Sequence, residues 1–179
     1  MRLVRRIMTA VAAMLLGLVV CALGVRLYMG RESEDRLALS EAVRIAELRS
    51  PLPEPGFLVC PPRYCSVAEA IASPVFDVSL DRLHEYWTEV IAPEKRIATV
   101  AADPDAGRFV YIQHSATLRF PDIITVELVP LGPDRSSIAI YSRSRYGSSD
   151  FGKNRKRVER WLVLLEKIAQ PARRARGRG

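Results

Sequence analysis

Histidine and cysteine, which supply most metal ligands and many nucleophiles, are scarce in this sequence. It contains two histidines, His84 and His114, and three cysteines, whereas a structural zinc site needs four clustered ligands. It also has no Gly-rich phosphate loop, no Gly-x-Ser-x-Gly elbow and no paired His motif. These absences predict no metal, no cofactor and no catalytic residue, and they favour a non-enzymatic protein over an enzyme.

Acidic residues are missing from both ends of the chain, and the ends carry its positive charge. The formal net charge is +7, residues 1–29 contain four Arg and no acid, and residues 171–179 contain four more Arg and no acid. Between these segments basic and acidic residues nearly balance. We therefore expect no nucleic-acid partner, because a nucleic-acid-binding domain is usually basic itself.

A long apolar run follows three arginines at the N-terminus. Residues 7–25 carry no charge, and about 20 apolar residues in a helix span a bilayer. The basic cluster before the run favours an N-in orientation. The sequence predicts a transmembrane anchor over residues 1–29 that contacts the membrane through residues 7–25. The protein would then be a single-pass protein of the bacterial inner membrane, with its domain on the periplasmic side.

Two other processing routes remain open for this segment. A secretory signal peptide could be cleaved after Ala22-Leu23-Gly24, although its apolar region is usually shorter, about 7–15 residues. A lipoprotein modified at Cys21 is the other alternative, in which Val20 stands where a small residue is expected. All three routes export the domain.

Charge and proline patterns divide the rest of the chain into three parts. Residues 30–56 predict a helical stalk followed by a linker rich in proline. Residues 57–170 predict one folded domain. The arginine-rich and glycine-rich stretch 171–179 predicts a disordered basic tail.

The periodicity of the domain predicts an α+β fold. A short strand at 74–78 precedes a helix that Ser79 caps and that ends before Pro93. A second amphipathic helix over 153–169 is expected to end at Pro171. Four β-rich runs with short links lie between the helices and favour an antiparallel meander: 96–102, 108–116, 123–129 and 136–142. We expect a sheet of about five strands with both helices on one face. This would be a helix-grip-like fold or a similar sandwich, with or without a cavity.

Two cysteines lie outside the apolar run. Cys60 and Cys65 are separated by four residues, and in an exported protein such a pair favours a structural disulfide. Free or buried thiols, and metal or redox chemistry, are the alternatives.

The segment 142–160 is the densest chemical signal in the chain. From Arg143 to Arg160 it contains seven basic and two acidic residues. It passes Gly147 and Gly152, where the backbone can adopt unusual dihedrals, and then opens a helix whose free N–H groups favour anions. We expect an anion-binding site formed by Arg143, Arg145, Lys153, Asn154, Arg155 and Arg119.

The alternative for this segment is structural. In that interpretation Asp150 caps the helix and pairs with an arginine, while a solvated helix face is formed by Arg155, Lys156 and Arg160. Asp122, in the segment Arg119-Phe120-Pro121-Asp122, is then a turn residue or the partner of an arginine.

The chain resembles the bacterial domain of unknown function 1499 family, DUF1499, from about Cys60 to Ile168. The likeness rests on three blocks: Cys60-Pro61 with Cys65-Ser66, Arg119-Phe120-Pro121-Asp122, and Arg143-Ser144-Arg145-Tyr146-Gly147-Ser148-Ser149-Asp150-Phe151-Gly152-Lys153-Asn154-Arg155-Lys156-Arg157. The family usually has Asn before the second cysteine, where this chain has Tyr64. The resemblance implies the same domain in an envelope setting and assigns no activity.

Together these patterns lead to one functional hypothesis and one alternative. The hypothesis is a membrane-tethered, non-enzymatic module that binds an anionic lipid, glycan or protein group at 142–157. The alternative is a structural or assembly subunit of a membrane protein complex.

Overall fold

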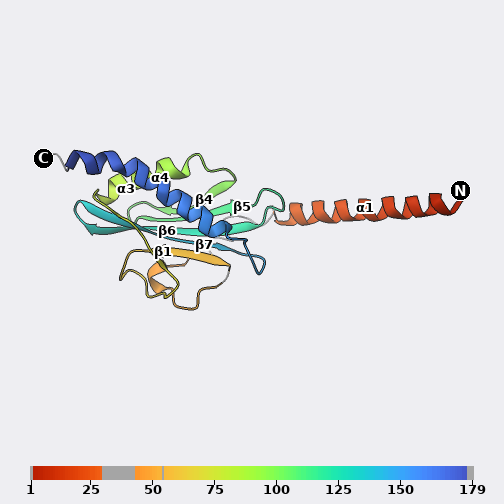
Figure 1. Cartoon of the computed structure of the whole chain (residues 1–179), viewed down its shortest axis with the longest axis horizontal. Coiled ribbons are helices and arrows are strands. Elements are labelled where there is room, and N and C mark those ends of the chain that lie inside the picture. Colours follow the sequence, from red (N-terminus) through yellow and green to blue (C-terminus); the bar gives the residue numbers. More distant parts are fainter. Residues whose placement is uncertain (1, 30–42, 54, 177–179) are drawn as a thin grey trace.

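The computed structural model describes residues 2–29, 43–53 and 55–176 (Figure 1). It confirms the α+β fold class, with a single mixed sheet and two helices packed on it. The sheet runs in the order β2-β1-β7-β6-β5-β4, with β3 pairing with β7 off this path. Its strands are β1 (Gly56–Cys60), β2 (Ile71–Ala72), β3 (Val75–Phe76), β4 (Ile97–Asp103), β5 (Arg108–His114), β6 (Pro121–Gly132) and β7 (Arg135–Ser144).

The meander predicted from the sequence is confirmed, because β4, β5, β6 and β7 pair in antiparallel succession. The sheet has seven strands where about five were expected. The additional strands are β1, which pairs antiparallel with β7, and the two-residue β2, which is parallel to β1. The run Phe57–Cys60 is buried throughout. It therefore lacks the polar alternation that marks a half-exposed strand.

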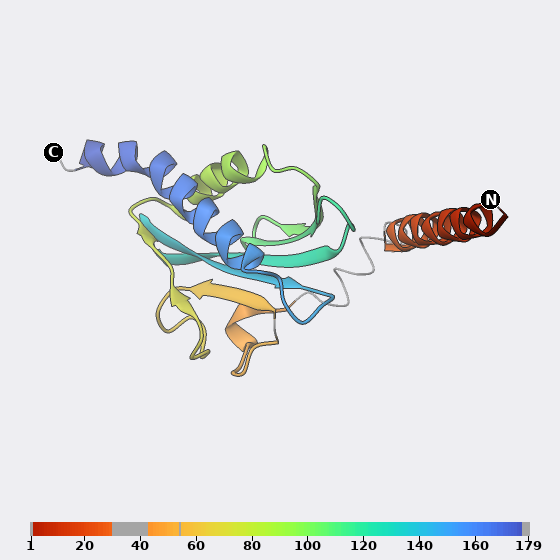
Figure 2. The ribbon, with the colours of Figure 1, turned by 45° about the vertical axis from the view of Figure 1, so that its right-hand side comes forward.

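Helices α3 (Leu80–Ile91) and α4 (Lys153–Arg176) cover the same face of the sheet, as expected (Figure 2). Ser79 caps α3 by accepting a hydrogen bond from the Arg82 amide at 3.4 Å. The indole rings of Trp87 and Trp161 meet edge to face with centroids 5.6 Å apart, a favoured aromatic geometry. Around them one continuous cluster of buried apolar side chains fills the layer between helices and sheet.

The expected end of the second helix is wrong. Helix α4 continues through Pro171 to Arg176, so the stretch predicted to be disordered from residue 171 is helical that far. Proline removes one backbone hydrogen bond from the helix. The alanines and arginines that follow Pro171 are strong helix formers and favour its continuation. Residues 177–179 lie outside the described part of the chain.

The opposite face of the sheet is covered by irregular segments. Most of the predicted stalk, residues 30–42, lies outside the described residues, and the chain next forms a short 3₁₀ helix, η1 (Ile45–Glu47). Ile45 is fully buried there in a cluster that includes Leu58 and Tyr141. Residues 43–53 thus pack on the sheet, and we call them the N-terminal strap.

A buried carboxylate joins the N-terminal strap to the sheet. Glu127 Oε1 accepts a hydrogen bond from the Ile45 amide at 3.3 Å, and Oε2 accepts one from the Tyr64 hydroxyl at 2.8 Å. Arg108 Nε lies 3.4 Å from Oε1. Burial and the bond to Glu127 raise the pKa of Tyr64 far above its usual value. Tyr64 sits in the loop closed by a disulfide between Cys60 and Cys65, whose Cα atoms are 6.4 Å apart.

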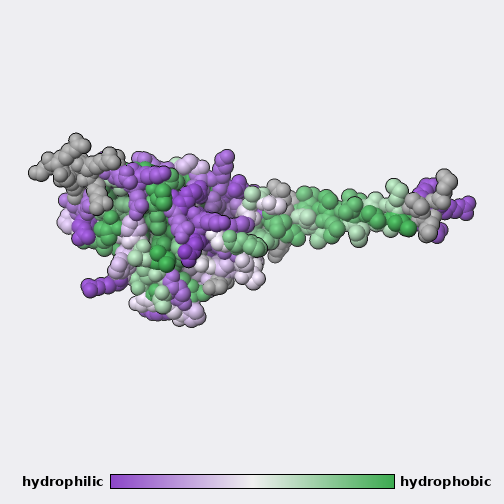
Figure 3. Space-filling model, in the orientation of Figure 1, coloured by the Kyte–Doolittle hydropathy of each residue, from purple (hydrophilic) through white to green (hydrophobic). Residues whose placement is uncertain are grey.

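Helix α1 (Arg2–Met29) contains one stretch, Arg5–Val25, that is long and apolar enough to cross a membrane. Figure 3 shows apolar side chains along the helix, whereas the visible face of the domain mixes hydrophilic and apolar areas. None of this stretch is buried against other parts of the structure. The structure thus contains an N-terminal helix long and apolar enough to span a membrane.

Candidate functional site

The basic segment 142–157 is organised around one buried guanidinium. The side chains of Arg157 and Asp122 form an ion pair and are only 10% and 11% exposed. Arg157 Nε donates to Gln113 Oε1 at 2.6 Å, and Nη1 donates to Ser142 Oγ at 2.8 Å and to Asn154 Oδ1 at 2.6 Å. The charge is thus compensated by an anion and by three neutral acceptors, as a buried charge requires.

Strand register brings these partners together. Asp122 on β6 pairs with Ser144 on β7, and Gln113 on β5 pairs with Asp122. Paired residues of neighbouring strands point to the same face of a sheet, here the face that α4 covers. Ser144 Oγ donates to Asp122 Oδ1 at 2.6 Å and accepts from Asn154 Nδ2 at 3.2 Å. Because Asn154 and Arg157 are three residues apart, both lie on the side of α4 that faces these strands.

Asp150 satisfies the first amides of α4. Its carboxylate accepts hydrogen bonds from the Gly152 amide at 2.9 Å and from the Asn154 amide at 2.8 Å. Burial raises the pKa of Asp150, but these amide bonds outweigh burial and leave the pKa below its usual value. The helix start is therefore already capped by the protein's own carboxylate, and an external anion must rely on side-chain cations.

We expect Asp150→Ala to lower the free energy of unfolding by about 1 kcal/mol at neutral pH, because the cap is lost. The wild-type carboxylate titrates lower in the folded than in the unfolded protein. Its contribution is thus complete above the ordinary Asp pKa and is lost as the pH falls through the folded value. Urea unfolding across this range measures the difference.

Asp150→Asn is the matched control, because its amide oxygen can accept the same bonds without a titrating charge. Its deficit at neutral pH should be smaller, and it should shrink as the pH falls, because only the wild type then loses a charged cap. A deficit for Asp150→Ala that stays constant down to strongly acidic pH would contradict the capping role.

A groove with a volume of about 900 Å³ lies beside this network. Three segments line it: residues 93–96 after α3, residues around the β5–β6 connection, and residues from the end of β7 into α4. Its lining includes three carboxylates and six basic side chains, namely Lys95, Arg96, Lys153, Lys156, Arg157 and Arg160. The groove thus has a surplus of positive charge.

The carboxylates in the lining are already engaged. Asp122 pairs with Arg157, Asp150 caps α4, and Glu94 Oε1 lies 2.9 Å from Arg160 Nη1. Within the described residues no carboxylate forms an ion pair with Lys95, Lys153 or Lys156, and all three side chains are exposed. These lysines are consequently available to an anion.

The residues predicted to form one anion site lie in different parts of the structure. Lys153 lines the groove, and Arg145 lies over the ring of the groove residue Tyr146 with its Cζ 5.3 Å from the ring centroid. Asn154 is buried in the Arg157 network. Gly147 and Gly152, with φ of 94° and 71°, make the turns that lead into α4.

Three other predicted cations, like Arg145, are not part of the groove lining. Arg143 follows Ser142 on β7, so its side chain leaves the sheet on the face opposite α4. Arg155 lies over the ring of Phe57, with its Cζ 4.7 Å from the ring centroid. Arg119 has a φ of 56° in the β5–β6 connection.

Sequence reasoning missed Lys95 as a groove residue, because it comes from a segment far from the basic motif. The structural alternative placed Lys156 on the solvated helix face, and neither interpretation assigned a role to Arg157. The apolar stripe of α4 could have shown that Arg157 lies one residue from the buried Val158 and one turn from Trp161.

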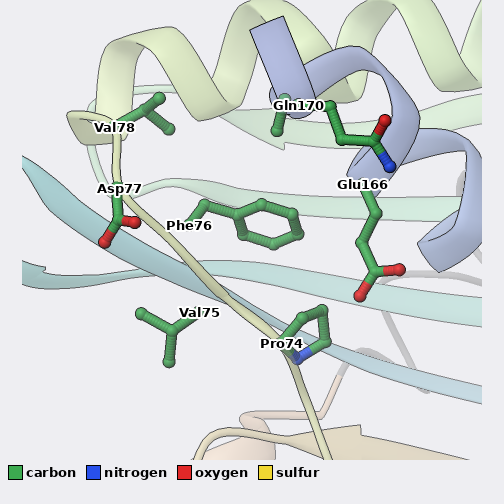
Figure 4. A pocket seen from close by; sticks show the side chains of 8 residues that line it. Pro74, Val75, Phe76, Asp77, Val78, Glu166 and Gln170 are labelled. Carbon is green, nitrogen blue, oxygen red and sulfur yellow. The ribbon is translucent and has the colours of Figure 1, made fainter. Parts of the chain in front are cut away.

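A smaller hollow lies beneath the later turns of α4 (Figure 4). It has a volume of about 210 Å³ and is lined by Pro74 to Val78 together with Glu166, Ala169 and Gln170. Its charged lining residues are the carboxylates Asp77 and Glu166, so it does not suit an anion. In the described ranges 2–29, 43–53 and 55–176, no three His, Cys, Asp or Glu side chains gather as a metal site would require.

The segment that holds the Arg157 network matches a known family. A family model described as "Protein of unknown function (DUF1499)" matches residues 61–165. The chain belongs to the DUF1499 family. The match includes Arg157 and every side chain that it contacts in the network, whereas α1 lies before it. No curated protein matches this chain.

Proposed function

We propose that this DUF1499 protein is a membrane-tethered, non-enzymatic module that binds an anionic group in the groove beside α4. The observation that supports the proposal is a set of exposed lysines, Lys95, Lys153 and Lys156, that line one groove and form no ion pair with a carboxylate in the described part of the chain. The buried Arg157 network beneath them fixes the start of α4, which carries two of these lysines.

The setting proposed for this module is the periplasmic side of a bacterial inner membrane. The stretch Arg5–Val25 is long and apolar enough to anchor it there. Three arginines lie at the N-terminal end of this stretch and favour an N-in orientation. A disulfide at Cys60–Cys65 suits an oxidising compartment. Its partners in this proposal are the membrane and an anionic lipid or membrane-protein group.

The lysines provide the test of anion binding. We expect the full chain in neutral detergent micelles to bind sn-glycerol 3-phosphate, and the double substitution Lys153→Gln, Lys156→Gln to weaken binding about tenfold. Each exposed charge pair contributes about 0.7 kcal/mol, and the two together correspond to a factor of ten. Titration calorimetry at low and raised salt measures the affinity, which should fall with salt.

Lys167→Gln is the matched control, since Lys167 is an exposed lysine on the same helix outside the groove lining. It should leave the affinity unchanged. Equal affinity of wild type and the double variant would rule out the groove as the anion site. In that case co-purification with a partner at fixed stoichiometry would favour the structural or assembly role.

A further inference from the structure

Two apolar side chains stand on the rim of the cationic groove. Phe151 is 82% exposed and Leu118 is 41% exposed, and both belong to the groove lining. Phe151 has a φ of 53°, a left-handed conformation that costs a non-glycine residue about 1 kcal/mol or more. The chain therefore accepts backbone strain at a residue whose ring remains in solvent.

Exposed apolar side chains and cations lie close together around this groove. Leu118 lies in the β5–β6 connection and Phe151 in the β7–α4 connection, while the exposed Lys95, Lys153 and Lys156 line the groove between them. This combination matches a lipid surface, where apolar groups enter the boundary of the acyl chains and basic residues attract anionic headgroups. Each basic residue near such a surface contributes about 1 kcal/mol.

We propose that the β5–β6 and β7–α4 loops dock on the anionic surface of the membrane that holds α1. A lipid phosphate would occupy the groove against Lys153 and Lys156, with Phe151 and Leu118 inserted beside it. This inference rests on the proposed function and names the ligand of the same groove as a phospholipid headgroup.

The anchor makes a weak contact of this kind effective. The chain between Val25 and Val43 can extend at most about 60 Å, so the domain remains within reach of the bilayer. Tethering replaces a bimolecular encounter with an intramolecular one at millimolar effective concentration. A surface with few cations and two exposed apolar side chains is therefore sufficient for the tethered domain to bind the membrane.

The chain offers a matched pair of leucines for the test. Leu118 and Leu131 are equally exposed, at 41% each. Leu118 precedes β6 on the groove side and Leu131 lies at the other end of β6, a strand of 12 residues, so the two are about 35 Å apart. Leu118→Trp and Leu131→Trp are made in the full chain, which is reconstituted into vesicles of phosphatidylcholine alone or of equal parts phosphatidylcholine and phosphatidylglycerol.

The readout is quenching of the added indole by lipids brominated on their acyl chains, after subtraction of the wild-type emission from the buried Trp87 and Trp161. In the mixed vesicles we expect most of the emission added by Leu118→Trp to be quenched, and the emission added by Leu131→Trp to be unaffected. Quenching at the Leu118 position should disappear in phosphatidylcholine alone and after Lys153→Gln, Lys156→Gln. Phe151→Trp should behave as Leu118→Trp does.

The outcomes separate this inference from the proposed function. If Leu118→Trp and Phe151→Trp are not quenched while glycerol phosphate still binds through Lys153 and Lys156, membrane docking is wrong and anion binding stands. If neither quenching nor glycerol phosphate binding occurs, both proposals fall. Equal quenching at Leu118 and Leu131, or quenching that ignores the lysines, would also overturn the docking surface.

Discussion

Replacing Arg157 with alanine is expected to lower the free energy of unfolding by about 4 kcal/mol. The substitution leaves the Asp122 carboxylate buried without its counter-charge, and breaking a buried pair from one side costs about 3–5 kcal/mol. It also removes the donors to Gln113, Ser142 and Asn154. Urea unfolding of the full chain in detergent micelles, followed by the fluorescence of the buried tryptophans, measures the change.

Arg155→Ala is the control for this experiment. Arg155 is an arginine of the same helix turn that is 58% exposed and contacts Glu159 and the ring of Phe57. Its loss should cost less than about 1 kcal/mol. Similar losses for the two variants would show that the Arg157 network does not hold the start of α4 on the sheet. Arg157→Lys should recover only part of the loss, since an ammonium cannot reproduce the fork of the guanidinium.

Replacing Glu127 with alanine is expected to lower the free energy of unfolding by about 3 kcal/mol, because it leaves a half-buried Arg108 without its anion and two donors without their acceptor. Those donors are the Ile45 amide and the Tyr64 hydroxyl. Both belong to segments that cover the face of the sheet opposite the helices. We therefore also expect the N-terminal strap, residues 43–53, to be cut faster by a protease.

Glu127→Gln tests whether charge or hydrogen bonding dominates. The amide oxygen can still accept from Ile45 or Tyr64, so we expect a loss of about 1 kcal/mol and little change in the rate of cutting. Glu159→Ala, which removes an exposed glutamate, should change neither quantity. An unchanged rate of cutting in Glu127→Ala would mean that the packing of Ile45 alone holds the N-terminal strap on the sheet.

The fold was largely predictable because its signals are local. The connections at 103–107 and 132–134 combine proline, glycine and aspartate, and they join strands that pair in antiparallel order. The apolar stripes of α3 and α4 likewise identify their buried faces. Strand β1 was not predictable, since a run that is buried on both faces shows no alternation and since prolines flank it.

The candidate site was only partly predictable, because the destination of each cation depends on tertiary register. The density of positive charge around 142–157 lies at one edge of the groove. Alternation along a strand puts Arg143 and Ser142 on opposite faces of β7, but the sequence does not show which of these faces α4 covers. Lys95 reaches the groove only because α3 ends beside the β5–β6 connection, which is a property of the assembled sheet.

The central claim is that an anion binds in the groove formed by these loops, and residue-resolved NMR tests it most directly. The full chain in neutral detergent micelles, labelled with ¹⁵N, is titrated with sn-glycerol 3-phosphate while the amide signals are followed. We expect shifts to concentrate in residues 93–96, 115–120 and 145–156, and we expect Lys153→Gln, Lys156→Gln to raise the ligand concentration at half-saturation about tenfold. Shifts that are absent, or that gather instead around the hollow beside Glu166, would contradict the claim.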